Sequence, residues 1–161
     1  MNKQDKHAHV ETLQSLQKNI NTLSKAKENN PSLEKTIETL RNSQDKLYAA
    51  LSYHGVSAEK VHKVIIENSD QAIVKEIMRL QGTKNTINRH LAESNLTPEK
   101  RQSLETRLTR ATQRHTAKWD EVIGSPDKDR IINKIEQAQI KQLQKEDRER
   151  DKSREHEGRS R

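Results

Sequence analysis

The chain has 161 residues, of which 29% are apolar and 34% charged, with no cysteine, no phenylalanine and one tryptophan. The absence of cysteine excludes disulfides and thiolate metal sites, and the scarcity of aromatic rings leaves aliphatic side chains to form a thin core. The net charge of +7 is spread evenly along the chain, which is weaker evidence for a nucleic-acid partner than a clustered basic patch would be.

Prolines and glycines divide the chain into predicted helices. Asn30-Pro31, Thr97-Pro98 and Ser125-Pro126 each place a capping residue before a proline at the first helical position, where its missing N–H costs nothing. Gly55 and Gly124 suit the left-handed position that ends a helix, and Ser57 caps the helix after Gly55. In chain order, these signals predict helices at about residues 7–28, 32–53, 58–94, 98–123 and 127–150.

The apolar residues of these helices recur at the spacing of a narrow seam. The second predicted helix carries Leu33, Ile37, Leu40, Leu47 and Leu51, and the third carries Ile73, Ile77, Leu80, Ile87 and Leu91. Gln44 and Lys84 occupy the skipped seam positions. Such stripes favour helix-on-helix packing, so the sequence predicts an all-α fold of elongated antiparallel hairpins, a coiled-coil-like bundle.

The sequence also predicts a tandem repeat of about 66–68 residues. Ser57–Lys60 aligns with Ser125–Lys128, Ile37–Thr39 with Leu104–Thr106, and Asp70–Ile77 with Glu136–Leu143. The run from Asn68 to Asp70 would otherwise suit a break or a kink, but the repeat favours one continuous helix over residues 58–94.

The predicted organisation has four parts. Residues 1–56 form a first helical hairpin, residues 57–124 a second hairpin that repeats it, residues 125–144 a C-terminal helix, and residues 145–161 a charged, partly disordered tail. No apolar run is long enough to span a bilayer, and the first residues contain no apolar signal core, so we expect a cytoplasmic protein. The Arg- and Glu-rich tail is similar in composition to export signals of bacterial type IV secretion substrates, which implies export without a conventional signal peptide as the alternative.

No constellation of residues predicts catalysis. The seven histidines form no metal-ligand frame, and His115 falls on an apolar stripe, where we expect a seam residue rather than a ligand. The letters Ser57-Ala-Glu-Lys60 match S-x-x-K, but the companion motifs of penicillin-binding enzymes are missing and a helix cap explains the serine. We therefore expect no enzyme, no metal and no cofactor.

Three functional hypotheses follow. The first is a non-enzymatic adaptor or scaffold that binds another protein or a second copy of itself, with Tyr48, Leu51, Tyr53 and Trp119 as interface anchors or core plugs near the glycine ends. The second is an accessory nucleic-acid-binding protein that uses a basic stripe made of Arg101, Arg107, Arg110, Arg114 and Lys118. That stripe has the simpler reading of charge flanking an apolar seam. The third is a bacterial type IV secretion effector fragment exported through its charged C-terminus.

Overall fold

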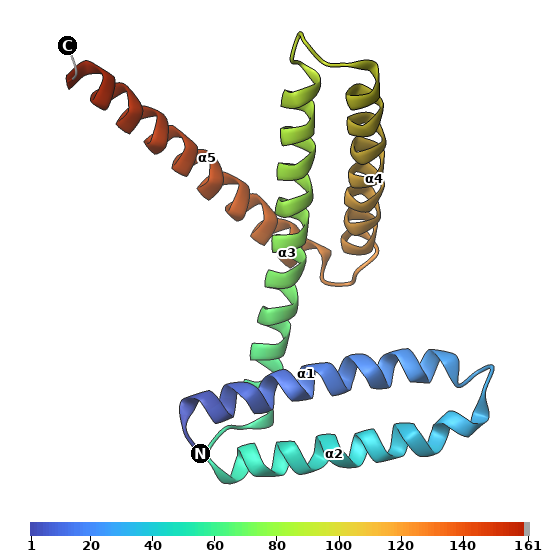
Figure 1. Cartoon of the computed structure of the whole chain (residues 1–161). Helices are drawn as coiled ribbons and strands as arrows, with labels where there is room; N and C mark the ends of the chain where they lie inside the picture. Colours follow the sequence, from blue (N-terminus) through green and yellow to red (C-terminus); the bar gives the residue numbers. More distant parts are fainter. Residues whose placement is uncertain (160–161) are drawn as a thin grey trace. The chain divides into compact units, whose positions relative to one another are not determined.

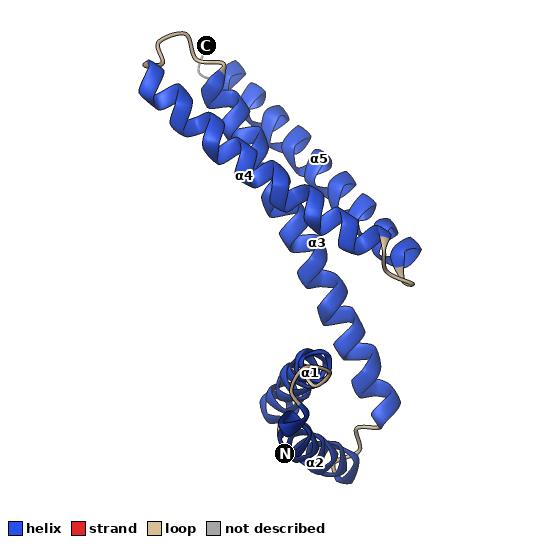
Figure 2. Cartoon of the chain, turned by 90° about the vertical axis from the view of Figure 1, so that its right-hand side faces the viewer, coloured by secondary structure: helices blue, strands red, loops and turns tan. Residues whose placement is uncertain are grey.

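The computed structural model describes residues 1–159, and the regular elements in that range are all helices, which confirms the predicted all-α fold (Figures 1 and 2). Its elements are α1 (Lys3–Ala26), the short 3₁₀ helix η1 (Pro31–Leu33), α2 (Glu34–Tyr53), α3 (Ala58–Leu91), α4 (Pro98–Ile123) and α5 (Lys128–Arg159). Residues 160 and 161, the last two of the predicted tail, lie outside the described residues.

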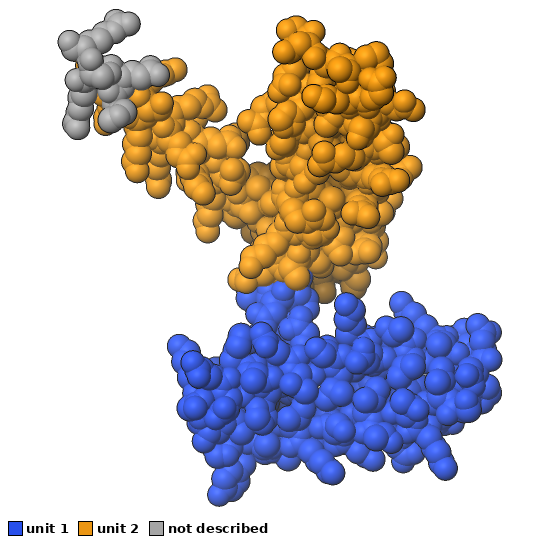
Figure 3. All heavy atoms as spheres, viewed as in Figure 1, with its two compact units in different colours: residues 1–69 blue, residues 70–161 orange. Residues whose placement is uncertain are grey.

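The chain divides into two compact units, residues 1–69 and residues 70–161, coloured separately in Figure 3. The division falls inside α3, which runs without interruption through the Asn68–Asp70 stretch and so has no break there. The first unit holds α1, α2 and the first turns of α3, and the second holds the rest of α3 with α4 and α5.

In the first unit, α1 and α2 pack antiparallel as a hairpin and share an aliphatic core (Figure 1). The buried members of that core are Val10, Leu13, Leu51 and Val61, with five partly buried neighbours. Where the predicted seam lacks an apolar residue, the Gln44 amide donates a hydrogen bond of 2.7 Å to Gln17 of α1. A polar pair therefore continues the seam between the two helices.

In the second unit, α3 and α4 form the other antiparallel hairpin, and the first turns of α5 add to it (Figure 1). The core cluster here consists of Ile77, Val122, Ile131 and Ile135, which come from α3, α4 and α5. Leu80, Ile87 and Ala111 are buried farther along the hairpin. Helices α2 and α3 thus bury or half-bury the stripes that their apolar spacing predicted.

Three of the predicted helix starts are built as expected. The Thr97 hydroxyl accepts a hydrogen bond from the Lys100 backbone N–H ahead of a helix that begins at Pro98, and Ser57 caps α3 in the same way through Lys60. The Asn30 side chain accepts from the backbone N–H of Ser32. There the first turn is the 3₁₀ helix η1, and α2 begins only at Glu34.

Other helix ends differ from the predictions. Gly55 has a φ of +83° and ends its helix as predicted, whereas Gly124 has a φ of −77° and is right-handed, so that part of the prediction is wrong. Helix α4 ends without a left-handed residue because Pro126 disfavours helical backbone at Ser125. Helix α1 begins at Lys3, since Asn2 and Asp5 form a capping box, and the charged α5 continues to Arg159 rather than to about residue 150.

Buried and half-buried positions recur between the two units at spacings of 67 and 71 residues. The buried Val10, Leu13 and Ile20 of α1 recur 67 positions later as the buried Ile77, Leu80 and Ile87 of α3. In the second helix of each unit, Tyr48 and Leu51 recur 71 positions later as Trp119 and Val122. The spacing of 71 pairs Ile37 with Leu108, whereas the predicted sequence alignment pairs it with Leu104, so the two registers differ in this helix.

Candidate functional site

The second half of α5 is the most exposed long element of the second unit. Every side chain from Gln139 to Glu155 is exposed, and we call this stretch the α5 extension (residues 139–155). Ile140 and Leu143 lie in it with 48% and 60% of their surfaces exposed. Figure 1 shows the C-terminal half of α5 apart from both α3 and α4. The extension therefore presents two large aliphatic side chains that nothing in the described unit covers.

The first turns of α5 are held firmly by the rest of the unit. Ile131 and Ile135 are 4% and 0% exposed in the core cluster. On the neighbouring face, Arg130 donates two hydrogen bonds to Asp70 of α3, of 2.8 and 3.1 Å, and the Lys134 ammonium donates a third, of 2.7 Å. The base of the extension is thus clamped to α3 by both apolar and ionic contacts.

Asp70 is the charged residue that the described chain buries most fully, at 2% exposure. The Arg130 hydrogen bonds, the Lys134 hydrogen bond and the two positive charges hold the pKa of Asp70 below its ordinary value, against the opposing effect of burial. The same pairing, with a second ion pair of 3.0 Å to Asp127, raises the pKa of Arg130. The site is a structural ion network, since each of its charged groups is paired with one of opposite sign.

Sequence analysis missed this network, although a signal was present. Asp70 stands three and seven positions before Ile73 and Ile77, so it falls on the apolar stripe of α3. Arg130 and Lys134 are four residues apart and directly precede the two buried isoleucines of α5. A carboxylate on a seam, together with an i,i+4 pair of cations beside another seam, predicts a buried ion pair between the two helices.

The sequence alignment of the predicted repeat pairs the exposed apolar residues of the extension with packed residues of α3. The predicted alignment of Asp70–Ile77 with Glu136–Leu143 pairs Ile140 with Val74 and Leu143 with Ile77. Val74 is partly buried and Ile77 is 1% exposed, both in the core cluster of the second unit. In this predicted alignment, the exposed Ile140 and Leu143 of α5 stand opposite the packed Val74 and Ile77 of α3.

The four residues predicted as interface anchors or core plugs separate into two groups. Leu51 is 0% exposed, and Tyr48 packs against the same core, with its ring 5.7 Å from that of His62 and its pKa raised by burial. Trp119 packs against the core cluster of the second unit. Tyr53 is 87% exposed at the end of α2, in an edge-on contact with the His54 ring at 5.1 Å. Only Tyr53 among the four presents its side chain to solvent.

The five residues of the predicted basic stripe also fall into two groups, those that line a groove and those that do not. Arg107, Arg110 and Arg114 line a groove of about 200 Å³ between α3 and α4, together with Arg79 of α3. Lys118 is half-buried and pairs with Glu121 at 3.1 Å, and Arg101 lies on the exposed first turns of α4, outside the lining of the groove. The structure thus brings three of the five predicted cations together and adds a fourth from another helix.

We call this feature the arginine groove and define it by Arg79, Arg107, Arg110 and Arg114 on its sides. The remaining lining consists of Thr83 and of the buried Leu80, Ile87 and Ala111, and it includes no carboxylate. Arg79 makes a two-pronged pair with Glu76, at 2.9 and 2.7 Å, which lowers the pKa of Glu76. The charges of Lys118 and Arg114 add to that effect.

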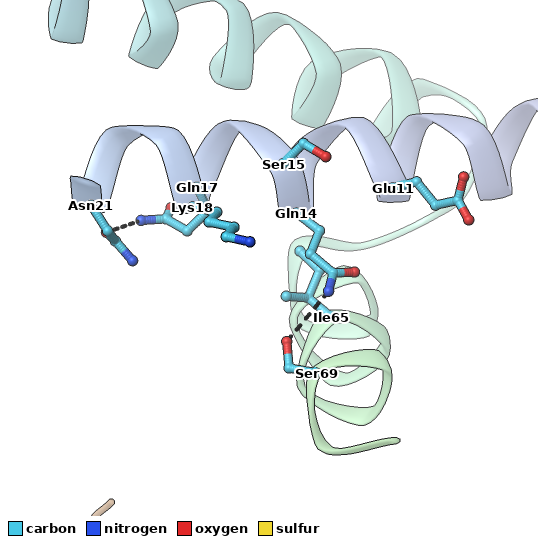
Figure 4. Close-up of a pocket in the computed structure, with 8 residues that line it drawn as sticks. All are labelled: Glu11, Gln14, Ser15, Gln17, Lys18, Asn21, Ile65 and Ser69. Atoms are coloured by element: carbon cyan, nitrogen blue, oxygen red, sulfur yellow. Dashed lines mark hydrogen bonds between the residues drawn. The ribbon is translucent and has the colours of Figure 1, made fainter. Parts of the chain in front are cut away.

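A groove of the first unit lies between α1 and the start of α3 and has a volume of about 590 Å³ (Figure 4). Its lining is mostly amide and hydroxyl side chains, and Gln14 donates a hydrogen bond of 3.4 Å to Ser69 across it. Small-molecule sites are usually apolar with a few converging polar groups. This groove lacks that character, because Ile65 is its one aliphatic lining residue.

The described residues were also compared with the requirements of a metal-ligand cluster and of a membrane-spanning helix. Within residues 1–159, no group of three histidine or acidic side chains is placed to hold a metal ion. No described helix combines the length and the apolar character needed to cross a bilayer. His115 lies half-buried on α4, where burial, aided by the positive charge of Lys84, lowers its pKa. Its surroundings are those of the seam residue that we expected.

Comparison with protein-family models, with curated proteins and with solved structures finds no match to this chain. The α5 extension and the arginine groove are thus the two surfaces of the second unit whose geometry points to a partner.

Proposed function

We propose that this chain is a non-enzymatic helical protein-interaction module, and that the α5 extension binds an amphipathic helix of a partner protein. The observation that carries the proposal is the exposure of Ile140 and Leu143, at 48% and 60%, on the same helix whose first turns bury Ile131 and Ile135. A helix that covered the two side chains would bury apolar area at about 25 cal/mol per Å², the usual driving force of such contacts.

The shape and charge of the extension suit a helical partner. Ile140 and Leu143 are i,i+3 neighbours on one face, which is the spacing that a facing helix accepts between its own side chains. Residues 139–155 contain six Lys or Arg and five Asp or Glu, so the extension has a net charge near zero and carries side chains of both signs. Mixed charges beside an apolar seam select a partner by complementary ion pairs.

The clamped base of α5 contributes to this function by limiting the cost of binding. Asp70, Arg130 and the buried Ile131 and Ile135 hold the first turns of α5 before any partner arrives. A surface held in its bound conformation loses less conformational entropy on association. The ion network therefore acts as a positioning element for the extension.

Photo-crosslinking tests the proposal in the full-length chain. A crosslinking amino acid replaces Gln142, between the two exposed side chains, and crosslinked peptides are mapped by mass spectrometry in the presence of cell extract and in the purified protein. We expect crosslinks to a helical segment, either of another copy or of a different protein, that the Ile140→Gln/Leu143→Gln variant loses. The matched control is Ile66→Gln/Ile123→Gln, which removes two exposed isoleucines from α3 and α4.

Light scattering during size-exclusion chromatography separates the two kinds of partner. Mass that rises with concentration between about 1 µM and about 1 mM identifies a second copy, and a constant monomer mass with retained crosslinks identifies a different protein. Crosslink yields that are equal in the wild type, the Ile140→Gln/Leu143→Gln variant and the control would refute the proposal.

A further inference from the structure

We propose that the arginine groove binds the phosphodiester backbone of a nucleic acid without reading its sequence. The inference goes beyond the helix-binding surface of α5, because it concerns a different face of the second unit and a different class of partner. Arg107, Arg110 and Arg114 lie on the α4 side of the groove, and Arg79 comes from α3.

The three arginines of α4 are available to an external anion. Among residues 1–159 no carboxylate forms an ion pair with Arg107, Arg110 or Arg114, whereas Arg79 and Lys118 are each paired within the chain. All three are exposed. Guanidinium groups bind phosphate oxygens in pairs through their planar fork, so unpaired arginines on a groove are suited to a phosphate ligand.

The arrangement fits a chain of phosphates better than a single anion. Arg107, Arg110 and Arg114 are spaced by three and four residues, so their Cα atoms follow one side of α4 at steps of about 5 to 6 Å. A single phosphate needs donors that converge on one point, while a polymer offers a negative charge at each step. The net charge of +7 would further attract a polyanion over distance.

The floor of the groove explains why recognition would be independent of sequence. Leu80, Ile87 and Ala111 are 2%, 2% and 6% exposed and offer no hydrogen-bonding groups to a base edge. No aromatic ring lines the groove on which a base could stack. Contacts to phosphate position a nucleic acid but carry no direct sequence information.

Fluorescence anisotropy with labelled oligonucleotides tests the proposal on the full-length chain. Two probes of equal length and mixed sequence, one single-stranded and one duplex, distinguish the two sources of a phosphodiester backbone. With three phosphate contacts, we expect the Kd to rise about 20- to 40-fold between 50 and 200 mM salt. The Arg107→Gln/Arg110→Gln/Arg114→Gln variant should lower the slope of log K against log salt by about 2 to 3.

The matched control removes the same charge elsewhere on the second unit. Arg148→Gln/Arg150→Gln/Arg154→Gln takes three exposed arginines from the α5 extension, and we expect it to keep most of the affinity and slope of the wild type. Circular dichroism checks that both triple variants remain helical, as expected for changes at exposed positions. Equal losses in both variants would show a response to net charge alone and would overturn the proposal.

Two other results would overturn it as well. One is the absence of salt-dependent binding to either probe at 50 mM salt. The other is binding of polyglutamate that depends on the same arginines while both oligonucleotides fail to bind, which would identify an acidic protein as the partner. Neither outcome depends on the α5 extension, so this proposal and the proposed function fail independently.

Discussion

Replacing Asp70 by asparagine should measure how firmly α5 is held to α3. The substitution keeps the shape of the side chain but removes the charge that accepts hydrogen bonds of 2.8 and 3.1 Å from Arg130 and of 2.7 Å from Lys134. Breaking a buried ion pair by removing one partner costs about 3–5 kcal/mol when the other charge stays buried. Here the Arg130 and Lys134 side chains are 39% and 28% exposed and regain water, so we expect a loss of about 2–3 kcal/mol.

Urea unfolding followed by circular dichroism measures this loss. The variant should show a lower midpoint at an unchanged slope, because the same surface is exposed on unfolding. A double-mutant cycle made of Asp70→Asn, Arg130→Gln and the variant that carries both changes should give a coupling energy between the two side chains of about 1 kcal/mol or more. The control is Arg79→Gln, which breaks the exposed pair with Glu76 and should cost less than about 1 kcal/mol.

The same network predicts a dependence of stability on pH. Because the folded pKa of Asp70 lies below its unfolded value of about 3.9, the unfolded state binds the proton more tightly in that range. The contribution of Asp70 is therefore fully present above about pH 4 and is lost as the pH falls through the folded pKa. The stability difference between the wild type and Asp70→Asn should shrink over that range. A variant within about 0.5 kcal/mol of the wild type at pH 7 would refute the reasoning.

Two further predictions concern backbone and histidine. Gly55→Ala should lower the free energy of unfolding by about 1 kcal/mol or more because its φ is +83°, whereas Gly82→Ala, inside α3 with open space around a new Cβ, should raise it by about 0.5–1 kcal/mol. Urea unfolding of the two variants decides this, and changes of the same sign would contradict it. Burial and Lys84 lower the pKa of His115, so its NMR titration should lie below 6.5. Protonation then favours the unfolded state, and His115 should cost stability as the pH falls through about 6.5, a trend that His115→Gln should weaken.

Local chemistry explains which features of the fold were accessible from the sequence. Thr97-Pro98 and Ser57 predicted helix starts correctly because a cap satisfies backbone donors within its own turn. The apolar spacing predicted the buried residues Leu51 and Ile77 for a similar reason, since a helical period places them on one face. Gly124 was assigned a left-handed conformation wrongly because several backbone geometries end a helix, and Pro126 was enough to end this one.

The sequence predicted some residues of the candidate sites but not how those residues come together. The sequence singled out Arg107, Arg110 and Arg114 by their spacing, but Arg79 joined them only when α3 and α4 had packed. Ile140 and Leu143 continued an apolar pattern in the sequence, and their exposure depends on which helices reach them in space. Neither fact could be read from one helix considered alone.

The amino-acid sequence by itself determined the helical class, most of the helix ends and the stripe that each helix buries, because these depend on neighbours within a few residues along the chain. Only the tertiary structure decided which apolar stripe packs against which other helix. In the folded unit, Asp70 pairs with Arg130, which lies 60 positions later in the sequence. Arginines of α3 and α4 line one groove, and the α5 extension stays exposed. Those outcomes depend on how packed helices meet in space, and no short-range pattern in the sequence specifies that.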